Sequence, residues 1–159
     1  MNRASLLTIA ALAVIYSNSL ADGEKRVSFM TPDNHYVSME AMGGINTKSS
    51  AITGKEIFNL LDLNEGKLDN GDEVIISTPG DKPTYWREGD NQVDRVGQKP
   101  DAACNFTVKN QETSILLKTP GGKFIGGAQT DSSGKTHLSI VEAEGETLQL
   151  EVVYEEAAK

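Results

Sequence analysis

The sequence of 159 residues predicts an all-β fold built from three copies of one four-strand unit. A Thr-Pro pair recurs at 31–32, 78–79 and 119–120, and apolar residues precede each threonine by two and by four positions. That spacing is the period of a strand with one buried face, and no segment shows a sustained helical period. One such unit cannot bury its own apolar face, so the three copies are expected to share a core.

Each Thr-Pro pair leads through a polar turn into a second strand that starts with an aromatic residue. The turns at 33–35, 80–84 and 121–123 are rich in residues that preset or tolerate the backbone angles of tight turns. The middle turn has two extra residues, which the tip of a hairpin can accommodate. The second strands are expected to start at Tyr36, Tyr85 and Phe124.

The later strands of each unit follow from sparser patterns. Isolated apolar residues in polar stretches predict the third strands at Ile45, Val93 and Leu138. Alternating segments predict the fourth strands around Phe58, Phe106 and Leu150. Residues 55–63 could also form a short helix, but their place in the repeat favours a strand. Three such units predict a β-trefoil with pseudo-threefold symmetry, and a two-sheet sandwich is the alternative.

The first 21 residues have the three parts of a secretory signal peptide. Arg3 supplies the positive charge, residues 6–16 are apolar, and Ser19-Leu20-Ala21 places small residues where signal peptidase needs them. The apolar run is shorter than the roughly 20 residues of a membrane-spanning helix. We therefore predict cleavage after Ala21 and a secreted chain, periplasmic in a bacterium. Residues 22–159 are predicted to form one domain, with repeats at about 25–70, 71–112 and 113–154.

The first repeat resembles the fascin-like branch of the β-trefoils. The resemblance rests on Tyr36-Val37, on Glu56-Ile57-Phe58 and on Gly71-Asp72-Glu73-Val74, and it is best over residues 27–78. Members of that branch that bundle actin are cytosolic and carry several trefoils in tandem, so the resemblance implies the fold and not actin bundling. The chain also lacks the Q-x-W motifs of ricin-type sugar-binding trefoils and the basic charge of heparin-binding ones.

The composition limits the partners. The formal net charge is −8, and basic residues are scattered along the chain. Nucleic acid, heparin-like polyanions and anionic membrane surfaces are therefore not expected to bind by nonspecific attraction. We read the acidity as a source of solubility, and we expect a monomer without a membrane-inserted segment.

No residue pattern indicates catalysis, a metal site or a cofactor. His35 and His137 fall in different repeats, and Cys104 is the only cysteine. Cys104 alternates with Phe106 and Val108, which places the thiol on the inner face of a strand, where a thiol is a poor nucleophile. The sequence therefore predicts a non-enzymatic protein with a buried thiol, and pairing of Cys104 between chains is the alternative.

The candidate binding residues lie in the second repeat, which deviates most from the other two. They are Tyr85, Trp86, Arg87, Asp90 and Asn91. If Tyr85 points inward, alternation turns Trp86 outward, where it could stack on a sugar or anchor a protein interface. The alternative is that Trp86 covers the base of the barrel. Asn105 begins an N-glycosylation sequon and is expected to face outward.

These observations predict a secreted, non-enzymatic binding module that recognises a glycan or an extracellular protein. The alternative is a secreted inhibitor or effector, for example of a protease. It would act through residues 80–103, which form the longest stretch without a clear strand pattern.

Overall fold

The computed structural model describes residues 23–155, so the predicted signal peptide lies outside the described residues. Among them, no helix is long and apolar enough to cross a membrane. The chain forms β1 (Glu24–Met30), β2 (Tyr36–Met39), β3 (Ile45–Ser49), β4 (Phe58–Asp62), β5 (Glu73–Ser77), β6 (Tyr85–Glu88), β7 (Val93–Val96), β8 (Phe106–Asn110), β9 (Ile115–Lys118), β10 (Phe124–Thr130), β11 (Thr136–Val141) and β12 (Glu151–Tyr154). Two short 3-10 turns are Ala102–Cys104 and Glu144–Glu146.

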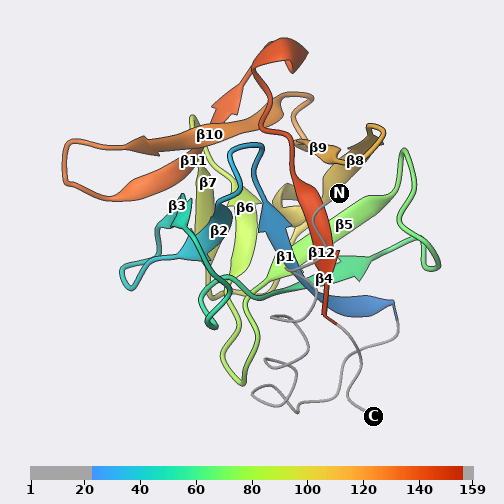
Figure 1. Cartoon of the computed structure of the whole chain (residues 1–159), viewed down its shortest axis with the longest axis horizontal. Helices are drawn as coiled ribbons and strands as arrows, with labels where there is room; N and C mark the ends of the chain where they lie inside the picture. The colour runs from blue at the N-terminus through green and yellow to red at the C-terminus, as the bar shows by residue number, and fades with distance from the viewer. Residues whose placement is uncertain (1–22, 156–159) are drawn as a thin grey trace.

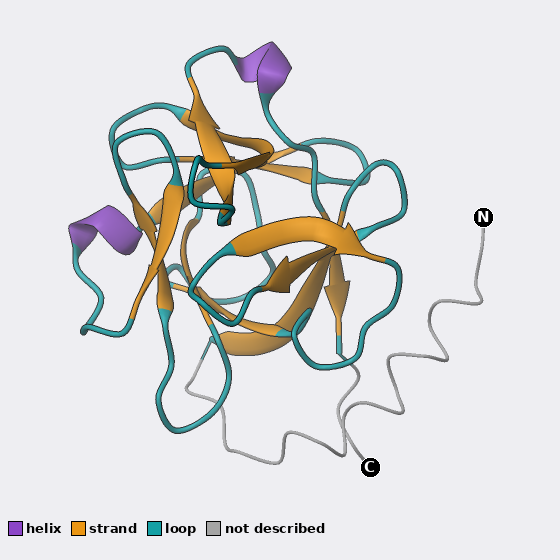
Figure 2. Cartoon of the chain, turned by 90° about the vertical axis from the view of Figure 1, so that its left-hand side faces the viewer, coloured by secondary structure: helices purple, strands orange, loops and turns teal. Residues whose placement is uncertain are grey.

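Half of the strands close into a barrel. Antiparallel pairing runs from β1 to β4, β5, β8 and β9, and β12 returns to β1. A bridge between Ile115 and Leu150 links β9 to the start of β12. The hairpins β2–β3, β6–β7 and β10–β11 gather on one side of the barrel (Figure 1), and β11 contacts both β3 and β7. We call these three hairpins the cap, which faces the viewer in Figure 2. This is the β-trefoil predicted from the sequence.

The apolar core repeats with the sequence. Six positions of each unit meet in one cluster, and all are buried except Val152, which is half-buried. The equivalent sets are Val27, Val74 and Ile115; Phe29, Ile76 and Leu117; Val37, Trp86 and Ile125; Ile45, Val93 and Leu138; Phe58, Phe106 and Leu150; and Leu60, Val108 and Val152. Each unit thus supplies the same share of a core that none could form alone.

The recurring threonine closes the first hairpin of every unit. The side chains of Thr31, Thr78 and Thr119 are all buried. Each threonine donates its backbone N–H to a carbonyl across the turn and accepts that residue's N–H on its hydroxyl. The partners across the turn are His35, Thr84 and Lys123, with hydroxyl distances of 3.3, 2.8 and 3.0 Å. The Thr-Pro repeat therefore has a structural cause.

The stretch 80–103 is not the long irregular loop that we expected. It contains β6, β7 and most of the Ala102–Cys104 turn. β6 and β7 each bury a single residue, Trp86 and Val93, so polar residues dominate this stretch and hide the alternation. Residues 58–62 form a strand, as the repeat predicted, and not a helix.

Candidate binding site on the hairpin cap

The expected orientation of Trp86 is wrong. Its side chain is 0 % exposed and lies in the core. The indole ring packs 5.6 Å from the ring of Phe29 and 5.3 Å from that of Phe58, measured between centroids. Tyr85, which we expected inside, is only half-buried. A side chain without exposed surface cannot stack on a sugar, so Trp86 is a core residue.

The reason lies in the second strand of every unit. The residue after the aromatic faces the core in all three units, as Val37 and Ile125 do. The aromatic residue itself lies to one side of the core, and Tyr36 packs in a separate small cluster with Ile52. Alternation was therefore correct, but the inner face was assigned to the wrong member of each pair.

The other predicted residues are spread over the second repeat. Arg87 is partly exposed and lies 3.5 Å from the carboxylate of Asp101. Asp90 and Asn91 are exposed in the β6–β7 turn, and Asn91 lines a hollow described below. Asn105 is half-buried directly before β8, and its glycosylation stays a prediction.

The residues considered for catalysis are accounted for by the fold. Cys104 is buried as predicted, and burial raises the pKa of its thiol. His35 lies in the turn before β2 with a partly exposed ring. Within residues 23–155 no group of three or more His, Cys, Asp or Glu side chains is arranged to hold a metal ion.

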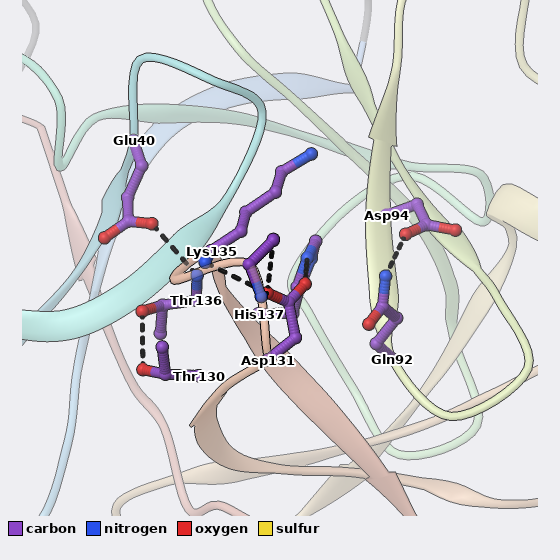
Figure 3. A network of polar contacts seen from close by, with 9 residues as sticks. Glu40, Gln92, Asp94, Thr130, Asp131, Lys135, Thr136 and His137 are labelled. Carbon is purple, nitrogen blue, oxygen red and sulfur yellow. Dashed lines mark hydrogen bonds and ion pairs between the residues drawn. The ribbon is translucent and has the colours of Figure 1, made fainter.

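Glu40 joins the three hairpins of the cap. Its carboxylate accepts hydrogen bonds from the backbone N–H of Thr136 at 3.2 Å and from Asn46 at 3.1 Å. Its carbonyl accepts a hydrogen bond from Arg95 of the second repeat. Figure 3 shows the Glu40 carboxylate directed at Thr136. The close approach needs Gly44, where a Cβ would lie 2.5 Å from the carbonyl oxygen of Thr136.

A hollow of about 360 Å³ lies between the β2–β3 and β10–β11 turns. We call it the outer hollow. Met42 on its rim is 81 % exposed, and Glu40 and Lys135 bring opposite charges to its wall. Its lining residues are Glu40, Ala41, Met42, Ser133, Gly134 and Lys135.

A smaller hollow of about 110 Å³ lies between the β6–β7 turn and the β10–β11 hairpin. We call it the polar hollow. Figure 3 shows Asp131 and His137 on one side of a gap and the hydrogen-bonded pair Gln92 and Asp94 on the other. Its lining residues are Asn91, Gln92, Gln129, Thr130, Asp131, His137 and Ser139.

The polar hollow contains a buried group without a partner in the described part of the chain. His137 is 5 % exposed; its Nε2 lies 3.5 Å from the Asp131 carboxylate, and its Nδ1 has no hydrogen bond. Asn91 and Gln129 line the same hollow and are exposed, so they present their side-chain amides to solvent. Hydrogen bonds from Ser133, and then from the Lys135 backbone, hold the pKa of Asp131 below its ordinary value. The hollow therefore combines one negative charge with exposed amide donors and acceptors.

Sequence reasoning missed most of this surface. It selected Asn91, but not Glu40, Met42, Asp131 or Lys135, although all belong to turns at equivalent places in the repeats. The available signal was the repeat itself, because the second hairpins of the three units of a trefoil converge on one cap.

Comparisons with known proteins support the fold. No protein-family model and no curated protein matches the chain. Similar solved structures include a Caenorhabditis elegans protein of unknown function, with a TM-score of 0.65, 8 % identity and coverage of 86 % of this chain and 97 % of that one. The SDF2-like protein of Arabidopsis thaliana has a TM-score of 0.64, 4 % identity and coverage of 86 % and 95 %. The Haemophilus ducreyi cytolethal distending toxin has a TM-score of 0.59, 10 % identity and coverage of 90 % and 93 %. At these identities the likeness concerns the fold alone.

Proposed function

We propose that this protein is a secreted, monomeric and non-enzymatic binding module that recognises a glycan or an extracellular protein through its cap. The observation that carries the proposal is the pair of hollows on either side of the β10–β11 hairpin. Turn residues line the outer hollow, and residues of the β6–β7 and β10–β11 turns together with the ends of β10 and β11 line the polar hollow. None of these residues belongs to the apolar core, and such surface residues are free to serve recognition. The exposed Met42 adds an adaptable apolar contact to a largely polar surface.

The chemistry of the cap supports binding over catalysis. Ser133, Asp131 and His137 lie close together, as in a hydrolase triad. The Ser133 hydroxyl, however, donates to the Asp131 carboxylate and not to the imidazole. A serine nucleophile needs a base that accepts its proton in line with attack, so this arrangement orders the turn and does not activate the hydroxyl.

Two finer assignments belong to the same proposal. We place the chain in the fascin-like branch, supported by the buried Glu56 and Phe58 of its E-x-F segment. The inhibitor alternative depended on one protruding loop at 80–103. That stretch is a hairpin followed by a 3-10 turn, and the cap supports a binding module better.

The test uses residues 22–159, labelled and applied to arrays of glycans and of extracellular proteins. Met42→Asp places a charge on the rim of the outer hollow, and we expect it to weaken binding by about tenfold or more. Leu63→Asp is the matched control, because Leu63 is also an exposed apolar residue, 43 % exposed, but lies after β4, outside the cap. A ligand that tolerates Met42→Asp, or that loses as much affinity with Leu63→Asp, would exclude the outer hollow as the binding surface, and capture of no ligand on either array would contradict the proposed function.

A further inference from the structure

The polar hollow has a feature that the packing of the fold does not explain. Its wall holds the imidazole of His137, which is buried and has one ring nitrogen without a hydrogen-bond partner. Leaving a buried polar group unpaired is energetically unfavourable, because the group loses its hydrogen bonds to water. Trp86 and Arg95 of the cap also have a buried nitrogen without a hydrogen-bond partner among the described residues, but neither side chain lines the polar hollow. The unpaired ring therefore points to something that enters the hollow.

We propose that the polar hollow is a subsite for one neutral sugar ring at the end of a glycan. This inference rests on the proposed function of the cap and names the ligand class for one part of it. Asn91 and Gln129 flank the hollow with amides that carry both donors and acceptors, and vicinal hydroxyls of a sugar match both. A hydroxyl is also the group that can pair with either tautomer of the His137 ring.

The charges of the site select a neutral ring. Asp131 is ionised at neutral pH, since its pKa is held low, and the chain as a whole carries a charge of −8. A carboxylated or sulfated sugar would meet repulsion from both. The nearby cation, Lys135, lines the outer hollow and not this one.

The composition of the wall also sets the strength of binding. The lining of the polar hollow contains no Trp, Tyr or Phe ring on which a sugar could stack. Hydrogen bonds to a sugar replace hydrogen bonds to water and yield a small net gain. We therefore expect a dissociation constant of about 1–10 mM for a single sugar, with tighter binding of a longer glycan that also reaches the outer hollow.

The test measures binding of methyl glycosides of glucose, galactose, mannose and N-acetylglucosamine by NMR, with sialic acid as the anionic comparison. We expect at least one neutral glycoside to saturate and to shift the ring resonances of His137. Asn91→Ala and Gln129→Ala should each weaken that binding by about three- to tenfold. Both residues are exposed, so the variants are expected to fold. Gln149→Ala is the matched control, an exposed amide beside a different hollow of about 200 Å³.

Three results would overturn the inference. The first is that no neutral glycoside shows saturable binding at about 50 mM. The second is that neither amide variant weakens binding, and the third is that the protein prefers sialic acid. The Met42→Asp comparison decides the proposed function separately. If that variant abolishes capture of an array ligand while no glycoside binds, the cap is a binding surface and the sugar subsite is wrong. If neither binding is found, both proposals fail.

Discussion

The barrel and the cap are built from the same three repeats but use them differently. In the barrel, equivalent residues do equivalent work, as Val27, Val74 and Ile115 do in the core. In the cap, the contacts that join the hairpins each occur once. The Glu40 carboxylate accepts a hydrogen bond from the backbone N–H of Thr136, and the Glu40 carbonyl accepts one from the Arg95 side chain. Threefold symmetry is thus kept in the apolar core and lost in the polar contacts that join the hairpins of the cap. The difference locates the part of the molecule that is free to specialise.

The largest expected effect on stability comes from Trp86, the one core position where a repeat has a much larger side chain than the other two. Trp86 occupies the position held by Val37 and Ile125 in the other repeats. Trp86→Ala should remove about 3–5 kcal/mol from the free energy of unfolding, because it leaves a large cavity between Phe29 and Phe58. Far-UV circular dichroism in urea measures the loss without depending on tryptophan fluorescence.

The control for Trp86→Ala is Ile125→Val at the equivalent position, with an expected loss of about 0.5–1.5 kcal/mol. A loss near zero for Trp86→Ala would show that the indole is not part of the shared core.

The next largest effect on stability is expected from replacing Glu56, which is 3 % exposed and lies just before β4. Burial pushes the pKa of its carboxyl up, but hydrogen bonds from Ser38 and Thr53 outweigh burial and hold it below the ordinary 4.5. Ionised Glu56 therefore stabilises the fold above about pH 4.5, and this contribution fades as the pH falls through the lower, folded-state pKa. Glu56→Gln should lower stability by about 1.5–3 kcal/mol at pH 7.

The measurement for Glu56 is urea unfolding between pH 3 and 7. The difference between the wild type and Glu56→Gln should shrink towards the acid end, while the exposed Glu112→Gln should show no such trend. A difference that stays constant with pH would mean that the charge of Glu56 does not contribute.

A smaller effect tests the symmetry of the barrel directly. Thr31→Val, Thr78→Val and Thr119→Val each remove a hydroxyl that accepts a backbone N–H across the first hairpin. Each should cost about 1 kcal/mol, and the three losses should be similar. Urea unfolding of the three variants checks this. If only one of them loses stability, the recurring threonine does not have a common role.

The sequence predicted the strands of both the barrel and the cap well, because packing against the core leaves a periodic record. Single apolar residues at Ile45, Val93 and Leu138 marked the third strands, since each cap hairpin buries that residue beneath it. The same reasoning failed at Trp86. Alternation separates two faces of a strand but does not say which face is inside, and the choice rested on the aromatic residue of each pair. In the structure that residue sits at the margin of the core, as Tyr85 does.

The polar contacts of the cap could not be predicted from residue patterns in the same way. The hydrogen bond between Glu40 and Thr136 joins residues 96 positions apart, and neither local composition nor period identifies such a pair. His137 illustrates the same limit, because it lines a hollow together with Asn91 and Gln92 of a different repeat. Polar contacts between turns follow from the three-dimensional arrangement, whereas the barrel follows from the periodicity.

The smallest expected effect on stability is that of Met42→Asp. Comparison with Gly44→Ala separates cap residues that only line the surface from those that allow the hairpins to pack closely. Met42→Asp should change the free energy of unfolding by less than about 0.5 kcal/mol, because the side chain is 81 % exposed. Gly44→Ala, two residues further on, should be clearly less stable, because its new Cβ would collide with the carbonyl of Thr136. Thermal unfolding of both variants measures the contrast. Similar melting temperatures for the two would mean that the β2–β3 turn moves freely against β11, and then the cap could not hold its hollows in a fixed shape.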